Sequence, residues 1–413
     1  MKYDCAVLGA GIIGISAALH LQSRGRHVCV IDKELPGAGA SIGNAGLIER
    51  SSVIPYAFPR QLGQLVRYAL NREPDVRYAP NAIPGMAGWL IDYWKQSSPE
   101  NLQRAVREML PLIERCVDEH DVLIAQAGIG SIVSSCGWIE IFRDQERFFA
   151  ARAEAGSLAS YKLSYDVFHQ REILDLEPGL NEAVVGGIRW NDPKTVRDPG
   201  AMLAAYTSLF QREGGTLTKG DVQDFRRDGA LWRIESDTGS ITAENVVIAL
   251  GADSDLLCHA LGYRVPLAVK RGYHLHFHPA SHGMPKHPLC DTAGGYVVAP
   301  MSAGIRLTTG IEFTRRNAPP NLIQIRRAER LARSVFAMGG QIESIPWMGR
   351  RPCLPDMRPV IGPAPNHPGI WFDFGHAHHG LTLGPVSGRL LAEQMTGVKP
   401  FADPSPFSIT RFT

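Results

Sequence analysis

The sequence predicts an α/β protein with two domains, one built on a parallel sheet with flanking helices and one on a mixed, largely antiparallel sheet. Three observations support this prediction. At 413 residues the chain is longer than one ordinary hydrophobic core, so two domains are expected. A strand, a group of glycines and a helix open the chain. Strand-like stretches separated by Gly- and Ser-containing turns dominate its middle.

The first 32 residues have the order of a Rossmann-type βαβ unit. A strand ends at Gly9, a Gly-x-Gly-x-x-Gly spacing leads into a helix, and a second strand ends at Asp32. Gly9 permits the tight turn, Gly11 lets a pyrophosphate approach the backbone, and Gly14 lets the helix pack on the strand. The helix N-terminus favours phosphate, and a carboxylate after the second strand accepts hydrogen bonds from ribose hydroxyls. The expected dinucleotide contacts are Gly9, Ala10, Gly11, Ile12, Ile13, Gly14, Asp32 and Lys33.

Three later segments favour FAD over NAD. Residues 35–46 are small and can approach a flat ring closely, although a surface loop is the alternative. A buried strand at 245–250 precedes Gly251, and a strand at 369–374 leads through a glycine-rich turn to a helix at 386–395. That helix N-terminus can stabilise negative charge on a reduced flavin. The further FAD contacts expected are Ser41, Asn44, Ala45, Gly46, Leu47, Val222 (beside the adenine), Gly251, Gly380, Leu381 and Thr382.

Together these motifs resemble the FAD-dependent D-amino-acid oxidase and glycine oxidase superfamily, over nearly the whole chain. The resemblance is greatest to its bacterial D-amino acid dehydrogenase branch. The SIGNAG segment and the double histidine before Gly380 look most like enzymes that oxidise D-hydroxyproline. The segments concerned are GAGIIG (9–14), ASIGNAG (40–46), ALGADS (249–254), WMGRRP (347–352) and GHAHHGLTLGP (375–385).

The resemblance implies a Rossmann-like FAD-binding domain and a substrate domain with a mixed, mostly antiparallel sheet. We expect the FAD-binding domain to be discontinuous, with residues 1–55, 197–262 and 345–413, and the substrate domain to comprise 56–196 and 263–344. Apolar spacing predicts helices within 56–128, broken by prolines. The expected strands of the substrate domain are 135–142, 186–190, 265–278, 294–301 and 304–312.

The implied reaction is the oxidation of a D-amino or D-imino acid, with hydride transfer from Cα to flavin N5 and electrons passed on to a quinone or another acceptor. The substrate class includes cis-4-hydroxy-D-proline. Two alternatives remain: a glycine- or sarcosine-type oxidase that uses oxygen, and a flavoprotein subunit of a larger complex. A third, an NAD-dependent dehydrogenase, would leave the purified protein colourless.

Three residues are candidates for contact with the substrate. The planar fork of an arginine matches a carboxylate, and the resemblance assigns that role to Arg351, whereas Arg350 should point to the other face of an extended segment. Tyr296 is the second expected carboxylate anchor, with an ordinary strand aromatic as the alternative. His379 is expected to line the substrate site or contact the flavin, or else to hold its turn. An apolar Leu47 favours a modest ring or an aliphatic substrate.

Composition excludes several other functions. The net charge of +2 comes from 43 basic and 41 acidic residues without a block of one sign, so we expect no nucleic-acid partner. The spacing of the histidines in residues 376–379 matches no common zinc set, so we expect no metal. Seven scattered cysteines and a strand at the N-terminus suggest a cytoplasmic protein. Peripheral contact with the inner face of a membrane remains compatible with the sequence.

Overall fold

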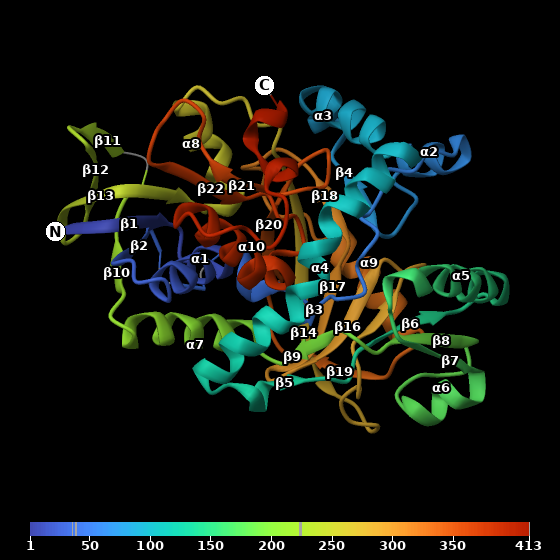
Figure 1. Cartoon of the computed structure of the whole chain (residues 1–413). Helices are drawn as coiled ribbons and strands as arrows, with labels where there is room; N and C mark the ends of the chain where they lie inside the picture. Colours follow the sequence, from blue (N-terminus) through green and yellow to red (C-terminus); the bar gives the residue numbers. More distant parts are fainter. Residues whose placement is uncertain (35, 38, 223–224, 413) are drawn as a thin grey trace.

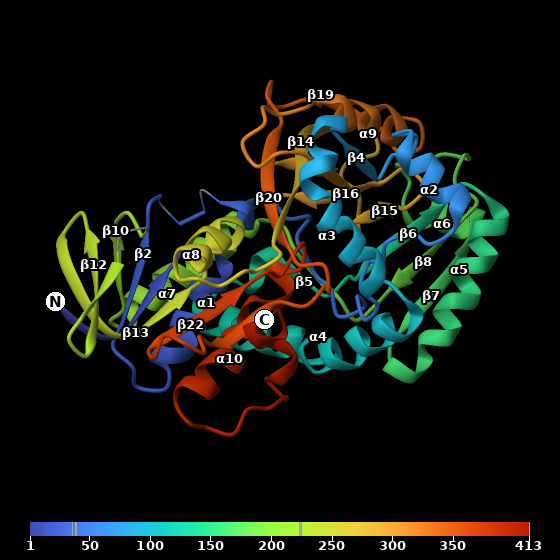
Figure 2. The same cartoon turned by 90° about the horizontal axis from the view of Figure 1, so that it is seen from above.

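Two large sheets organise the computed structural model, which describes residues 1–34, 36–37, 39–222 and 225–412. Figures 1 and 2 show the sheets side by side, with the N-terminal strand in the first. The strands of the first sheet are β1 (Lys2–Leu8), β2 (Val28–Asp32), β10 (Thr216–Lys219), β11 (Phe225–Asp228), β12 (Leu231–Ser236), β13 (Gly239–Ile248), β21 (Val360–Pro363) and β22 (Ile370–Phe374). Its helices are α1 (Ile12–Gln22), α7 (Pro199–Arg212), α8 (Ser254–Ala260) and α10 (Gly380–Met395).

The core of the first sheet is parallel, in the order β10-β2-β1-β13-β22. Successive β1 side chains are buried on opposite faces: Cys5 and Val7 pack towards α1, α7 and α10, and Ala6 and Leu8 pack towards α8. Burial on both faces explains the continuous apolar run at the N-terminus. The α/β class and the βαβ order predicted from the sequence are confirmed.

Strand β10 differs in direction from the strands that follow it. It runs parallel to β2 at one edge of the sheet. Strands β11, β12 and the start of β13 form antiparallel pairs.

The second sheet is mixed, with mostly antiparallel pairs. Its strands are β4 (Val76–Tyr78), β6 (Trp138–Phe142), β7 (Tyr165–His169), β8 (Gly186–Trp190), β14 (Ala268–Pro279), β15 (Leu289–Asp291), β16 (Tyr296–Met301), β17 (Gly304–Thr309), β18 (Ile311–Phe313), β19 (Met338–Gln341) and β20 (Trp347–Cys353). A small third sheet contains β3 (Leu47–Ile48), β5 (Val133–Ser134) and β9 (Lys194–Val196). The remaining helices are α2 (Leu62–Ala69), α3 (Ile83–Gln96), α4 (Pro99–Ala127), α5 (Gln145–Ser157), α6 (Gln170–Leu176) and α9 (Ile323–Arg333).

The expected strands of the second sheet and the helices between residues 56 and 128 are present. The domain boundaries remain a prediction. The pairing of β20 with β14 of the second sheet places residues 347–353 there, although the expected boundary at 345 assigns them to the FAD-binding part. No helix in the described ranges is long and apolar enough to cross a membrane.

Helix α10 begins at Gly380, earlier than the sequence suggests. Pro385 lies inside it and cannot donate a hydrogen bond to the carbonyl of Leu381. The buried His120 of α4 takes over this acceptor, with 2.6 Å between its Nε2 and the Leu381 oxygen. A distant side chain therefore completes a helical turn that the local sequence disfavours.

Helices α1 and α10 pack closely because glycines face α1. A Cβ at Gly388 would lie 2.7 Å from the Ala17 nitrogen, and one at Gly384 would lie 3.1 Å from the Ile12 side chain. Both helices also begin beside one cavity, which Ile12 and Gly380 line.

Candidate active site

A cavity of about 690 Å³ is lined by residues from both large sheets and from α2 and α3. Most of the residues that the sequence predicts for flavin or substrate meet here. Those that line it are Ile12, Ile13, Ser41, Asn44, Ala45, Leu47, Gly251, Tyr296, Arg351, His379, Gly380 and Leu381.

The glycine turn after β1 leaves no room for side chains. Gly9 has a φ of +113°, and a Cβ there would lie 2.4 Å from the Ala249 oxygen. A Cβ at Gly14 would lie 1.9 Å from the Gly9 oxygen. Ser41 Oγ accepts a hydrogen bond from the Ile12 N–H at 3.0 Å. Among the described atoms that are not its chain neighbours, this hydroxyl alone lies within 4 Å of where a Gly11 Cβ would be. Gly11 thus presents bare backbone at the helix start, as a pyrophosphate requires.

Asp32 lies at the end of β2, next to this turn. Its Oδ2 accepts a hydrogen bond from the Ala10 N–H at 2.6 Å, and its Oδ1 accepts one from the Glu34 N–H at 3.0 Å. The carboxylate is thereby fixed beside the glycine turn. The Lys33 ammonium lies 3.4 Å from Asp253 Oδ2 on the surface.

Val222 follows β10 and is buried in the core beside β2. Its contact with adenine remains a prediction. Residues 35 and 38 of the small-residue run lie outside the described residues, so their approach to the flavin also remains a prediction. Gly251 has a φ of +56° and lines the cavity.

The segment around Asn44 is folded onto itself. Asn44 Oδ1 accepts hydrogen bonds from the N–H groups of Gly46 and Leu47, at 2.7 and 3.2 Å. Gly46 has a φ of +78°, and a Cβ there would lie 2.2 Å from the Val196 oxygen. Gly46 is therefore required by a close approach of backbone to backbone.

Thr382 ties this segment to the start of α10. Its buried Oγ1 donates to the Leu47 oxygen at 3.2 Å and accepts from the Glu49 N–H at 3.1 Å. These bonds hold Leu47 and Gly380 at the same end of the cavity. Thr382 itself lies behind the lining.

Arg351 lies on β20, opposite Lys270 of β14. Its Nη1 donates to the Gly310 oxygen at 2.9 Å, and a Cβ at Gly272 would lie 2.3 Å from Nη2. Burial lowers the pKa of the Arg351 guanidinium below its ordinary value. The neighbouring Arg350 faces away, 3.7 Å from Asp253. The alternation expected from an extended segment is confirmed, and Arg351 lines the cavity without an ion pair among the described residues.

Lys270 is a second cation in the lining, and the sequence analysis missed it. It is 7% exposed, and its Nζ lies 4.9, 4.4 and 5.1 Å from the ring centres of Trp89, Tyr93 and Phe313. These rings compensate part of the lost hydration by cation–π attraction. Burial and the nearby Arg351 charge lower the pKa of Lys270. No local pattern in the sequence marks it, because a lysine is ordinarily an exposed residue.

Tyr296 lines the cavity, and the anchoring of a carboxylate by its hydroxyl remains a prediction. The hydroxyl donates to the Leu331 oxygen of α9 at 3.5 Å, and the residue is 3% exposed. Burial and the charge of Asp291 raise its pKa. Tyr56, on the segment before α2, is another tyrosine of the lining; its ring packs edge-on against His378 at 4.9 Å.

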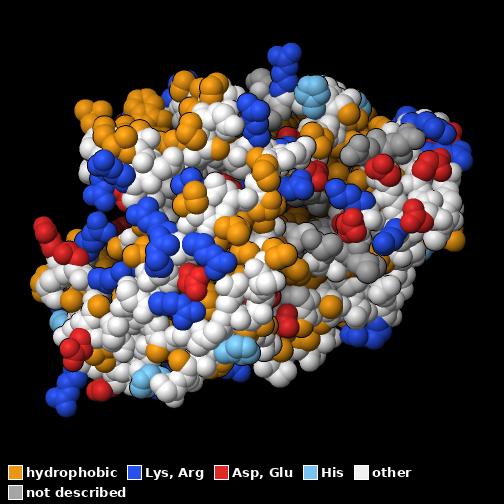
Figure 3. Space-filling view, turned by 180° about the vertical axis from the view of Figure 1, so that it is seen from behind, with side chains coloured by type: hydrophobic (Ala, Val, Ile, Leu, Met, Phe, Trp, Pro, Cys, Tyr) orange, Lys and Arg blue, Asp and Glu red, His pale blue; other side chains and the backbone are white. Residues whose placement is uncertain are grey.

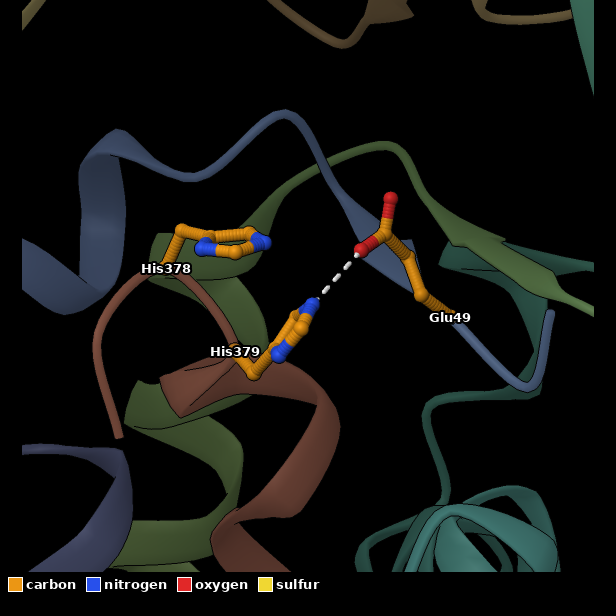
Figure 4. Close-up of side chains that lie close together, drawn as sticks. All are labelled: Glu49, His378 and His379. Atoms are coloured by element: carbon orange, nitrogen blue, oxygen red, sulfur yellow. Dashed lines mark ion pairs between the residues drawn. The ribbon is translucent and has the colours of Figure 1, made fainter. Parts of the chain in front are cut away.

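His379 joins a polar group that the sequence analysis did not anticipate. Its Nε2 lies 2.9 Å from Ser52 Oγ and 3.3 Å from Glu49 Oε2. Figure 4 shows the rings of His378 and His379 beside one another, with His379 pointing at Glu49. A carboxylate, a hydroxyl and an imidazole in contact can hold and exchange a proton.

Glu49, His378 and His379 also have ligand atoms within 4.8 Å of one another, as a metal site would need. Burial and the charges of His379, Arg351 and Lys270 lower the pKa of His378. The same positive charges oppose a metal cation. The arrangement is better suited to proton exchange, and the expectation of no metal remains a prediction.

Comparisons with known proteins agree with this geometry. The model of the family described as FAD dependent oxidoreductase (DAO) matches residues 4–394. The chain belongs to this family. It is 30% identical to a D-amino-acid oxidase of Bradyrhizobium diazoefficiens, over 98% of both chains. It is 27% identical to a D-amino acid dehydrogenase of Chromohalobacter salexigens, over 98% of this chain and 99% of the relative.

The fold is similar to that of glycine oxidase from Geobacillus kaustophilus, with a TM-score of 0.72, 21% identity, and coverage of 100% of this chain and 99% of the other. The cofactor of the family is FAD, and the residues present fit it. Bare backbone at Gly11, the fixed Asp32 carboxylate and a cavity extending from α1 to the start of α10 match a phosphate, a ribose and a ring site. The predictions of an FAD-dependent oxidoreductase and of its fold are confirmed.

Proposed function

We propose that this enzyme oxidises the Cα–N bond of a D-amino or D-imino acid. The observation that carries the proposal is Arg351, a cavity-lining guanidinium whose hydrogen bonds go to the carbonyls of Gly310 and Thr309. A cation without an acidic partner in a half-buried cavity attracts a carboxylate, and the guanidinium fork matches its two oxygens. Curated relatives named D-amino-acid oxidase and D-amino acid dehydrogenase support the choice of substrate class.

Different residues of the cavity bind the carboxylate and the amine of the substrate. Arg351 binds the carboxylate, and Lys270 adds a second positive charge on the same wall. The group of Glu49, Ser52 and His379 accepts the proton of the substrate amine, which must be neutral to be oxidised. FAD, when bound, supplies the two-electron oxidation.

Within this class we propose a cyclic substrate such as cis-4-hydroxy-D-proline. Leu47 and the aromatic residues Tyr56, Tyr93 and Trp347 line the cavity and suit a small apolar ring. The lining carboxylates are Glu49, Asp75, Asp291 and Asp373. Glu49, Asp291 and Asp373 lie against His379, Arg143 and His376, and Asp75 accepts a hydrogen bond from Tyr68. We further propose that electrons pass to a quinone or a similar acceptor, with the enzyme at the inner face of a membrane.

The test is anaerobic bleaching of the flavin absorbance by separate additions of cis-4-hydroxy-D-proline, D-proline, D-alanine, glycine and the L enantiomers. Rapid bleaching by a D-imino acid and none by its L enantiomer is the expected result. Bleaching by glycine alone, with oxygen consumed afterwards, would replace the proposal by a glycine-type oxidase. A yellow protein that none of the amines bleaches would contradict the proposed substrate class.

A further inference from the structure

Exposed large hydrophobic side chains are concentrated in one segment. Of the sixteen in the described part of the chain, seven come from residues 54–94. Helix α2 has no buried residue at all. Tyr56 lies in the cavity lining against His378. The other six define what we call the α2–α3 face: Ile54, Leu62, Val66, Leu70, Ile91 and Trp94.

The apolar side chains follow the helical repeat. Leu62, Val66 and Leu70 are spaced by four residues and share one side of α2, where they are 81%, 57% and 54% exposed. The neighbouring side of the same helix, with Leu65 and Tyr68, lines the cavity. Ala69 also lines the cavity. Helix α2 is therefore a thin wall at the edge of the active-site cavity, and its apolar side chains continue from the lining to the outer surface.

Helix α3 continues this wall. Tyr93 is buried and donates a hydrogen bond to the Tyr56 oxygen at 2.5 Å, and Leu90 lines the cavity. Ile91 and Trp94 point outwards and are 52% and 41% exposed. In Figure 1, α2 and α3 lie together at the upper right of the molecule.

Basic side chains accompany the apolar ones. Residues 56–98 contain five basic and three acidic residues. Arg60 lies over the Trp94 ring at 4.3 Å, and Arg72 is exposed, while Arg67 and Lys95 are paired with Glu73 and Asp92. In Figure 3, hydrophobic side chains with Lys and Arg beside them gather at the upper left, where these helices lie.

The apolar and basic side chains together indicate which kind of partner binds the α2–α3 face. An amphipathic helix with basic flanks lies in the interface of a bilayer, and each Lys or Arg near an anionic surface adds to binding. A second copy of the chain would bring Arg60 and Arg72 towards their own equivalents, because a twofold interface pairs a surface with itself. Charge complementarity thus favours an anionic lipid surface.

We propose that the α2–α3 face binds a bilayer containing anionic phospholipid, with its apolar side chains in the interface. Binding in this way places the wall of the cavity against the membrane. A lipid-soluble electron acceptor could then reach the cavity between α2 and α3 without crossing water. The proposal rests on the membrane location given in the proposed function, whereas the assignment of the substrate does not depend on it.

The test is co-sedimentation of the holoenzyme with vesicles of phosphatidylcholine alone or mixed with phosphatidylglycerol. We expect binding to the mixed vesicles that weakens with salt, and at least tenfold weaker partitioning for Leu62→Glu/Val66→Glu. The matched control, Val122→Glu/Leu256→Glu, changes two exposed apolar residues elsewhere (52% and 48% exposed) by the same charge and should bind like the native chain. Arg60→Gln/Arg72→Gln should lose only the preference for phosphatidylglycerol.

Bleaching of the flavin by substrate in solution is measured on every variant. This separates an error in the proposed substrate from an error in the proposed membrane-binding surface. Equal binding of the α2 variant and the control would overturn the proposal, as would no binding of the native chain. A concentration-dependent dimer in sedimentation, abolished only by the α2 variant and unaffected by vesicles, would assign the face to a second copy instead.

Discussion

The two walls of the cavity are built in different ways. The sheet wall carries Lys270 and Arg351 on the paired strands β14 and β20, and β14 is buried continuously from residue 268 to residue 277. The helix wall consists of α2 and α3, and α2 has no buried residue. The two cationic side chains thus lie on strands whose pairing fixes their positions. The helix wall packs little against the rest of the chain, so its apolar side chains remain free to contact the proposed membrane.

The largest effect is expected at the glycine turn that anchors the sheet end of the site. In Gly14→Ala the new Cβ would lie 1.9 Å from the Gly9 oxygen, so α1 must move away from β1 at a cost of at least about 3 kcal/mol. The variant should purify without bound flavin and melt at a lower temperature. Gly130→Ala, where no described atom lies within 4 Å, is the control. Retention of flavin by Gly14→Ala would contradict the assignment of this turn.

The difference between the walls predicts different costs of truncation. Leu307 of β17 is 0% exposed in the core of the second sheet, and Leu307→Ala should lower the free energy of unfolding by about 2–5 kcal/mol. Leu62 of α2 is 81% exposed, and Leu62→Ala should change it by less than about 0.5 kcal/mol. Denaturant unfolding measures both, and a similar loss in the two variants would show that the helix wall is packed after all.

Much of this contrast can be predicted from the sequence. The glycine spacing and Asp32 are local patterns with strict geometric requirements, so they locate the nucleotide end without a structure. The role expected of Arg351 comes from the resemblance of the WMGRRP segment to the family. Lys270 and Glu49 could not be found in this way, because a lysine in a strand and a glutamate after one are ordinary surface residues until distant segments pack on them. The Tyr296 hydroxyl depends on where α9 lies, which no local pattern encodes.

A smaller, pH-dependent effect is expected at Glu140 on β6 of the sheet wall. Burial raises its pKa to about 7, despite a hydrogen bond with Thr292. Between about pH 4.5 and pH 7 the folded carboxyl keeps its proton while the unfolded one loses it, so its contribution to stability falls as pH rises and is lowest above pH 7. Glu140→Gln should therefore be more stable than the native chain at pH 8, by about 1–3 kcal/mol.

That advantage should shrink as the pH falls from 7 to 4.5. Melting curves at a series of pH values measure it, with exposed Glu213→Gln on the surface as the control. A constant difference at all pH values would mean that the carboxyl of Glu140 titrates normally.

The central claim is that Arg351 on the sheet wall binds the substrate carboxylate. It is tested most directly by rapid anaerobic mixing, with the second-order rate of flavin bleaching measured for the best substrate of the panel. Arg351→Lys keeps the charge but loses the two-pronged fork, and the rate should fall at least about 30-fold, equivalent to about 2 kcal/mol. Arg350→Lys, on the opposite face, should stay within about twofold of the native rate. An Arg351→Lys enzyme that bleaches as fast as the native one would contradict the account.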